Sequence, residues 1–384
     1  MPRLPLVLLV LVLVTAPLSA ENWKFAVAGD SRNCGDVVMP AIAGAVKSSA
    51  AAFYWHLGDF RVLSNFDQDM QHAAKNPMTI LSYSAAAWPD FLRNQIAPFV
   101  PIPVYLGIGN HELVQKTRGD YIAQFADWLT QPAIQKQRLN DDPNDHMVRP
   151  YYHWIQGGVD FVTLDNASTE MFDEGQMSWL EKILDRDAKN PEVKTVILGI
   201  HAALPHSLGC EHSMNEWAQG ESSGTRVYRR LLDFRNGSKK KVYVLASHSH
   251  FLLRDVYDSD YWRSHGGVLP GIIIGTAGAV RYRLPDTALA FPPERARTDV
   301  YGFLLASVSD DGSIDFAFRE IERGAIPAEV EQRHGKDFVD WCFNANSDPN
   351  PRSSAPCAAA SAPCGPTGVS RSGSERRDAT EPSS

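Results

Sequence analysis

Short apolar runs alternate with helical or polar stretches along most of the chain. Five runs of four to seven residues are rich in β-branched or aromatic side chains and are bounded by glycine or polar residues; they span residues 25–28, 52–57, 102–108, 195–200 and 242–246. Such runs are typical of strands that are buried on both faces of a sheet. The pattern therefore predicts five buried strands.

Other apolar runs are predicted to form hairpins and helices. Residues 151–155 and 159–164 flank two adjacent glycines, and residues 302–308 and 314–318 flank an Asp-Asp-Gly turn. Both arrangements are typical of antiparallel strand pairs.

Helical periodicity predicts helices at residues 37–50, 121–130, 175–188 and 225–234. Strand–helix units mixed with hairpins indicate an α/β sandwich, in which helices cover two sheets.

The two ends of the chain differ in character from the part between them. Residues 1–20 hold one charge, Arg3, and an apolar run of about ten residues, which is short of the ~20 needed to span a bilayer. A small residue at Ala20 favours a signal peptide that is cleaved there; the alternative is an uncleaved N-terminal anchor. Residues 344–384 are rich in Pro, Ser and Ala and are predicted to be a disordered tail. Residues 21–343 are then one folded domain, with no membrane span after signal cleavage.

The net charge and the cysteines indicate which partners and which compartment suit this domain. The 384 residues carry a formal net charge of -8, which argues against a nucleic acid partner because phosphate backbones bind basic surfaces. An exported chain meets oxidising conditions, so its five cysteines can pair. Cys357 and Cys364 are close enough in sequence to bridge locally, but the connectivity stays open.

Polar side chains follow each of the five predicted buried strands. They are Asp30, Asp59, Asn110, His201, His248 and His250. One such residue alone is more often a turn or cap residue than a ligand. Six of them in sequence order at strand ends predict a shared site, because side chains at the carboxyl ends of α/β strands converge. Two carboxylates, an amide and three imidazoles suit Mn, Fe, Zn or Co.

The sequence blocks around these residues resemble those of a known family. Gly29-Asp30-Ser31-Arg32, Gly58-Asp59, Gly109-Asn110-His111-Glu112, His201 and Ser247-His248-Ser249-His250 resemble the five signature blocks of calcineurin-like metallophosphoesterases. The resemblance implies a four-layer fold, with two mixed β-sheets packed face to face and flanked by α-helices. It also implies a centre with two divalent transition metals.

The resemblance further implies a role for each residue of the centre. Asp59 would bridge the two metals; Asn110, His201 and His248 would complete one site, and Asp30 and His250 would serve the other. His111 would lie near the leaving-group oxygen, as general acid or as a hydrogen-bond donor. Glu112 would either orient His111 or cap the following helix.

One position departs from the family pattern. Arg32 stands where most of the family has a histidine ligand, and arginine cannot coordinate a metal because it stays protonated. Two outcomes are open. Arg32 points its fork at a substrate phosphate and the first metal binds weakly, or Arg32 turns into a surface pair and Asn33 or water completes the shell.

Two long connections, residues 61–99 and 202–223, are predicted to be insertions over the active face. In the second, His206, Glu211 and His212 either line the pocket or are solvated. Farther along the chain, Arg281 and Arg283 either contact an anionic substrate or are ordinary surface charges.

The function expected from these features is metal-dependent hydrolysis of phosphate mono- or diesters outside the cytoplasm, in a secreted or periplasmic protein. The substrate would be a small phosphorylated molecule bound by Arg32, Asn110 and His111. The alternative is an exported protein of the same fold that binds a phosphate ligand with one metal and turns nothing over; Arg32 favours that alternative, and the retained His111 speaks against it.

Overall fold

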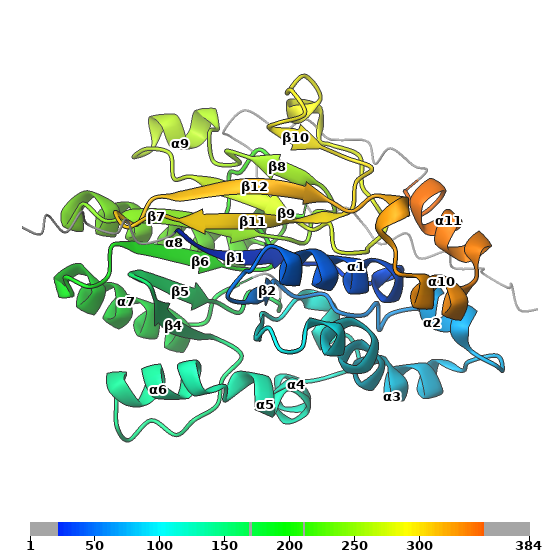
Figure 1. The fold of residues 1–384 in the computed structure, drawn as a ribbon. Coiled ribbons are helices and arrows are strands. Elements are labelled where there is room, and N and C mark those ends of the chain that lie inside the picture. The colour runs from blue at the N-terminus through cyan, green and yellow to red at the C-terminus, as the bar shows by residue number, and fades with distance from the viewer. Residues whose placement is uncertain (1–21, 169–170, 210–211, 349–384) are drawn as a thin grey trace, which may run out of the picture.

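The structure is a computed structural model that describes residues 22–168, 171–209 and 212–348 (Figure 1). The predicted signal peptide, Glu211, and the predicted tail beyond residue 348 lie outside these ranges.

The first of two mixed sheets carries the N-terminal strand at its centre. Within the described residues, five strands pair in the order β12-β11-β1-β2-β3. Strands β1, β2 and β3 are parallel, whereas β11 and β12 are antiparallel neighbours. Their bounds are Trp23–Ala28 (β1), Tyr54–His56 (β2), Val104–Leu106 (β3), Gly302–Val308 (β11) and Ile314–Glu320 (β12).

The second sheet is built from the middle of the chain. In the described ranges, seven strands pair in the order β10-β8-β9-β7-β6-β5-β4, and β5, β6, β7 and β9 are parallel. Their bounds are Tyr152–Gln156 (β4), Val159–Thr163 (β5), Thr195–Gly199 (β6), Lys241–Ala246 (β7), Leu252–Arg254 (β8), Gly271–Ile274 (β9) and Ala296–Arg297 (β10).

Helices connect the strands and cover the outer faces of the sheets. The α-helices are α1 (Gly35–Ser48), α2 (Gln68–Ala73), α3 (Ile80–Phe91), α4 (Arg118–Gln124), α5 (Ala126–Leu129), α6 (Pro132–Asp141), α7 (Glu174–Lys189), α8 (Ala218–Ser238), α9 (Asp260–Ser264), α10 (Ala328–His334) and α11 (Lys336–Asn344). Shorter turns are η1 (Leu92–Ile96), η2 (Ala97–Phe99), η3 (Asn110–Leu113), η4 (Met214–Glu216), η5 (Asp286–Ala288) and η6 (Arg323–Ala325).

Aromatic side chains hold the two sheets face to face. Phe53, which precedes β2, has its ring centroid 5.5 Å from that of Trp154 on β4 and 5.1 Å from that of Phe161 on β5. Trp55 on β2 packs edge-on against the same Trp154 and Phe161 rings. These side chains are almost fully buried, and burial of such large apolar surfaces is the main favourable contribution to folding.

A second buried cluster forms between the outer face of the second sheet and helices α7 and α8. Val162, Val196 and Leu198 of the sheet share it with Leu180 and Leu231 of the helices. Helix α1 packs on the first sheet and belongs to the other cluster (Figure 1). The four-layer α/β sandwich predicted from the sequence is confirmed.

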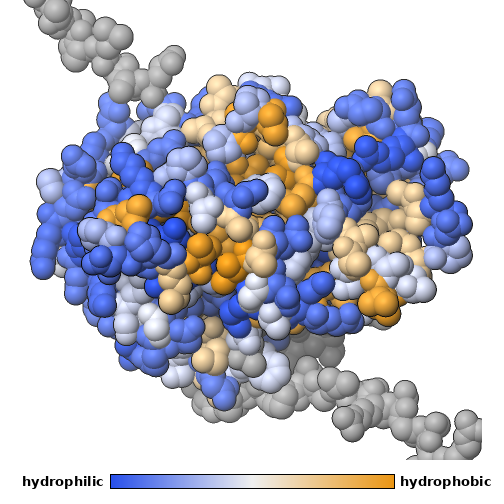
Figure 2. Space-filling view, turned by 90° about the horizontal axis from the view of Figure 1, so that it is seen from below, coloured by the Kyte–Doolittle hydropathy of each residue, from blue (hydrophilic) through white to orange (hydrophobic). Residues whose placement is uncertain are grey.

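The predicted elements differ from the structure mainly in the connections. Residues 121–130 form two helices, α4 and α5, because the chain leaves the helical region at Phe125 (φ -107°, ψ 21°). The insertion at residues 61–99 contains α2, α3 and a π-helical turn rather than a loop. Seen from below, where α3 to α6 lie, apolar side chains gather in the middle of the face between polar margins (Figure 2).

The C-terminal end of the described chain is tied to the start of α1. A disulfide joins Cys34, which directly precedes α1, to Cys342 of α11. Residues 344–348, which were counted in the predicted tail, are folded: Asn346 is buried and its carbonyl accepts a hydrogen bond from the Arg281 backbone N–H. No helix among the described residues is both long and apolar enough to cross a membrane.

A buried histidine on β4 makes stability depend on pH. His153 lies between Asp160 of β5 and Asp141 of α6, with Nδ1 2.8 Å from the Asp160 carboxylate. Arg186 and Asp187 of α7 also face Asp160. Burial lowers the pKa of His153, but the two carboxylates outweigh burial and raise it to about 9.

We therefore predict a loss of stability as the pH rises through about 9. The protonated ring is favoured in the folded state, so its contribution is fully present below the unfolded pKa of ~6.5 and is lost above about 9, by roughly 3 kcal/mol at most. Urea unfolding at pH 6 and pH 9.5 measures this difference. His153→Gln should reduce the difference, and the exposed His146→Gln should keep it; equal pH dependence in all three proteins would contradict the prediction.

Candidate metal centre

The residues predicted as ligands lie where parallel strands end. β1, β2 and β3 are parallel in one sheet, and β6 and β7 are parallel in the other, so their carboxyl ends meet at one edge of the sandwich. The residues that follow these strands are Asp30 after β1, Asp59 after β2, Asn110 after β3, His201 after β6, and His248 and His250 after β7.

Three of these residues converge on one nitrogen atom of a fourth, His201. His201 Nε2 lies 3.0 Å from Asn110 Oδ1, 3.0 Å from His248 Nδ1 and 3.3 Å from Asp59 Oδ1. Asp59, His201 and His248 are buried, and each offers an atom within 4.8 Å of the others. Three of the donors come from different strand ends, and the fourth comes from the start of η3, so the fold rather than the local sequence brings them together.

The electrostatics of this group fit a bound cation. Among the described residues, none donates a hydrogen bond to the buried Asp59 Oδ2. Burial alone would raise the pKa of Asp59, but His201, His111 and Arg32 hold it well below its usual value. Burial would lower the pKa of His201, and the Asp59 charge outweighs it, raising that pKa to about 9.

A buried carboxylate that draws a proton onto a neighbouring imidazole is a place where a metal can displace the proton. The mixed nitrogen and oxygen donors match those preferred by divalent transition metals. The four residues therefore fit a metal ion.

Hydrogen bonds outside the group orient its histidine. His201 Nδ1 lies 3.1 Å from the Leu57 carbonyl, which can only accept, so Nδ1 carries a hydrogen and Nε2 faces the cluster. Ser247 Oγ lies 3.1 Å from the same Nδ1 and donates to the Leu57 carbonyl. Ser247 therefore helps to hold a ligand in place.

The backbone around the centre takes conformations that few residues adopt. Asp30, Asp59 and His248 have φ of 61°, 59° and 64°, in the left-handed region. Such conformations cost free energy in non-glycine residues and gather at functional sites. Glycine is required beside them: at Gly58 (φ 98°) a Cβ would lie 2.5 Å from the Gly109 nitrogen, and at Gly109 it would lie 2.3 Å from Asp59 Oδ1.

Glu112 joins two of the ligand loops. Its buried carboxylate accepts hydrogen bonds of 2.8 Å from the backbone N–H groups of Asp59, Phe60 and Gly109. The bond from Gly109 caps η3, which is one of the two roles left open by the sequence. The bonds from Asp59 and Phe60 fix the loop after β2 as well, a role that the sequence pattern did not indicate.

The remaining predicted ligands form a second group with Arg32. Asp30 Oδ1 lies 3.2 Å from His250 Nε2, and Asp30 Oδ2 accepts from the His248 backbone N–H. The Arg32 guanidinium points into this group: Nη2 lies 2.9 Å from His250 Nε2, and Nη1 lies 3.6 Å from Asp59 Oδ2.

The structure also bears on the two outcomes left open for Arg32. Its side chain is 9 % exposed and faces the centre instead of joining a surface pair. The Asn33 side chain is engaged elsewhere, since Nδ2 donates to Gln68 Oε1 and Oδ1 accepts from the Val280 backbone N–H. Asn33 therefore does not complete a metal shell in this arrangement.

His111 lies between Arg32 and the metal-ligand group. Its Nδ1 donates to the Val62 carbonyl, so Nε2 of the neutral ring accepts a hydrogen bond from Arg32 Nη1. Burial and, next, the Arg32 charge lower its pKa to about 4. The ring is therefore neutral near pH 7 in this arrangement.

Two aromatic side chains border the centre beside His248 and His250. The ring of His212, from the insertion after β6, lies 5.0 Å from the His248 ring. The Tyr282 ring stacks on the His250 ring at 3.9 Å. His212 was a candidate pocket residue from the sequence, whereas Tyr282 was not predicted, because its only sequence signal is an aromatic residue in a loop between two arginines. Of those arginines, Arg281 is buried against Asn346, away from solvent, and Arg283 is exposed.

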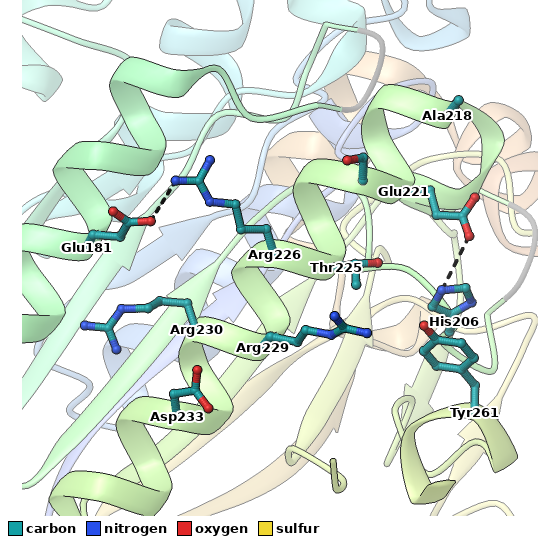
Figure 3. A pocket seen from close by; sticks show the side chains of 11 residues that line it. Glu181, His206, Ala218, Glu221, Thr225, Arg226, Arg229, Arg230, Asp233 and Tyr261 are labelled. Atoms are coloured by element: carbon teal, nitrogen blue, oxygen red, sulfur yellow. Dashed lines mark hydrogen bonds and ion pairs between the residues drawn. The ribbon is translucent and has the colours of Figure 1, made fainter. Parts of the chain in front are cut away.

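His206 belongs to a different part of the molecule. It faces a cavity of about 670 Å³ beside α8, where its ring stacks on Tyr261 at 3.5 Å and its Nε2 pairs with Glu221 (Figure 3). Arg226 in the same cavity is paired with Glu181. His206 is therefore not part of the metal centre.

One family model and two solved structures are similar to this chain. The family model described as "Calcineurin-like phosphoesterase" matches residues 24–268. Among solved structures, "Structure of PhoD" is 13 % identical with a TM-score of 0.50, covering 85 % of this chain and 77 % of that chain. "GAP50 the anchor in the inner membrane complex of Plasmodium" is 12 % identical with a TM-score of 0.42, covering 88 % and 99 %. No curated protein matches the chain.

Removing a residue of the four-residue group should abolish tight metal binding. We expect Asp59→Ala and His201→Ala to lose the metal that the wild-type protein retains after dialysis, because each removes a charge or a lone pair from a buried site. Metal content is measured by mass spectrometry of the dialysed protein. His206→Ala is the matched control and should retain wild-type content; retention of metal by Asp59→Ala would exclude this group as the site.

Replacing the Glu112 carboxylate, which joins the two ligand loops, should reduce the affinity for metal without removing a metal ligand. We expect Glu112→Gln to lower metal affinity by ~10–100-fold, because one backbone N–H then faces an amide NH₂ and the loops lose their alignment. A competition titration with a chromogenic chelator measures the affinity. Circular dichroism shows whether the variant is folded, and unchanged affinity in a folded variant would contradict the positioning role.

Proposed function

The chain belongs to the calcineurin-like phosphoesterase family, and we propose that it hydrolyses phosphate mono- or diesters with water activated by a divalent transition metal. The observation that carries the proposal is the convergence of Asp59, Asn110 and His248 on His201 Nε2 at the edge of the two sheets. A bound metal would supply a water of lowered pKa and would polarise a phosphoryl oxygen.

The residues around this group would bind and orient the phosphate. Asn110 and His111 are half-buried and so stay accessible beside the buried ligands. The Arg32 guanidinium would donate hydrogen bonds to the phosphate oxygens and neutralise part of their charge.

His111 would serve the leaving group. The bond from its Nδ1 to the Val62 carbonyl keeps the ring in place with Nε2 toward the centre. A bound phosphate would raise the pKa of this ring, since an opposite charge favours the protonated form. Nε2 could then hold the proton that the leaving oxygen takes up.

We also propose that the protein works outside the cytoplasm. The apolar segment within residues 1–20 supports export. The disulfide between Cys34 and Cys342 supports an oxidising compartment, since such bonds are rare in reducing ones. The substrate is proposed to be a small phosphorylated molecule. The second metal implied by the family resemblance would need Asp30 and His250 as ligands.

A second candidate function is binding of a phosphate ligand without turnover. The observation in its favour is the position of Arg32, which holds both His250 and His111. Tight binding of phosphate with no hydrolysis over a panel of Mn, Fe, Zn and Co would decide for it.

Hydrolysis can be tested with p-nitrophenyl phosphate and bis-p-nitrophenyl phosphate in the presence of Mn²⁺. We expect turnover by the wild-type protein and by the control His206→Ala, and none above background by Asp59→Ala. His111→Asn should lower kcat by ~10²–10⁴-fold with unchanged metal content. If His111 gives the proton, the loss should be larger for an alkyl ester than for p-nitrophenyl phosphate, because the poorer leaving group needs it more. Equal turnover by wild type and Asp59→Ala would refute the proposed function.

A further inference from the structure

Arg32 stands among the atoms that the first metal of a two-metal centre would need. We propose that this protein binds one metal per chain and that the Arg32 guanidinium is a permanent second cation in place of the other metal. The inference rests on the proposed function for the identity of the first site, but it concerns metal stoichiometry and not the ester that is cleaved.

Arg32 contacts two of the atoms that the first metal would need. Nη2 lies 2.9 Å from His250 Nε2, Nη1 lies 3.6 Å from Asp59 Oδ2, and Nη1 also hydrogen-bonds His111 Nε2. A metal would have to lie within about 2.0–2.2 Å of the same nitrogen and carboxylate atoms. The guanidinium and a metal cannot both occupy that space.

The lone pair on His250 Nε2 already accepts a hydrogen bond. Its Nδ1 lies 2.6 Å from the Val280 carbonyl, which can only accept, so Nδ1 carries the hydrogen of the neutral ring. Arg32 Nη2 can only donate, so Nε2 carries no hydrogen and the ring is neutral. Nε2 therefore has one lone pair, and it accepts from Arg32 Nη2.

The space beside Asp30 and His250 nonetheless requires a positive charge. The electron-rich atoms Asp30 Oδ1 and His250 Nε2 lie 3.2 Å apart in a buried place, with the Asp59 carboxylate nearby. Such atoms repel unless positive charge lies beside them. The guanidinium supplies that charge, and it cannot be lost by deprotonation because arginine stays protonated in proteins.

The segment that carries Arg32 is anchored, which keeps the guanidinium in the centre. The Asn33 backbone N–H donates to Asp67 Oδ1 at 2.7 Å, and the Asn33 side chain bonds Gln68. Cys34 follows directly and is held by the disulfide to Cys342. The backbone beside Arg32 is therefore held in place, and the Arg32 side chain is not a mobile surface group that reaches the centre from outside.

The test is the number of Mn²⁺ ions bound by the full-length protein without any phosphate. Chelator-treated protein is titrated with Mn²⁺, bound metal is counted by mass spectrometry, and electron paramagnetic resonance separates an isolated Mn²⁺ from a spin-coupled pair. We expect one tightly bound Mn²⁺ and no spin coupling in the wild type. Arg32→His should bind a second Mn²⁺ and give the spin-coupled signal, because it removes the cation and adds a ligand.

A matched arginine variant controls for the substitution itself. Arg263→His replaces an exposed arginine of α9 that pairs with Asp258 and Asp260, and the variant should bind one Mn²⁺ like the wild type. If Arg32→His does not fold, the wild-type count still decides.

Two bound, spin-coupled Mn²⁺ ions in the wild type would overturn the inference, as would no bound Mn²⁺ at all. Two ions together with ester hydrolysis would leave the proposed function intact. One ion with no hydrolysis of any ester would support the inference and overturn the proposed function, so the two failures are distinguishable.

Discussion

Burial of the Asp30 and Asp59 carboxylates at the edge where the two sheets meet is the constraint on which the centre depends. Both side chains are fully buried, and an ionised carboxylate removed from water is costly unless a cation or several hydrogen bonds compensate it. The surrounding groups provide this compensation: the His201 ring, which takes up a proton, lies beside Asp59, Arg32 lies near Asp59 and His250, and the His248 backbone N–H donates to Asp30. A metal at His201 would complete the compensation.

That arrangement of charge requires a rigid frame, because a shift of one loop would leave a buried charge without a partner. Aromatic packing of Phe53 and Trp55 against Trp154 fixes the separation of the sheets. Glu112 then locks the loop after β2 to the loop after β3 through three backbone hydrogen bonds. The left-handed backbone at the ligand positions is tolerated because these contacts determine it from several sides.

Much of the fold and of the candidate site could be predicted because the signals are local. A short apolar run that ends in a polar residue is visible in a few consecutive residues, and five such ends gave the six positions now seen around His201 and His250. The helices of residues 61–99 were missed because weak amphipathic patterns in a connection resemble a polar loop. Tyr282 was missed because stacking on His250 leaves no mark in the neighbouring sequence.

The sequence by itself determined the strand ends, the residue types that they carry and the presence of an arginine where a histidine is usual in the family. Only the tertiary structure decided which of those residues meet, that Arg32 faces His250 and Asp59, that Asn33 bonds Gln68 instead, and that Cys34 pairs with Cys342. The physical reason is the range of the interactions. Hydrophobic periodicity is set by neighbours along the chain, whereas the direction of a charged side chain is set by buried partners that lie dozens to hundreds of residues away.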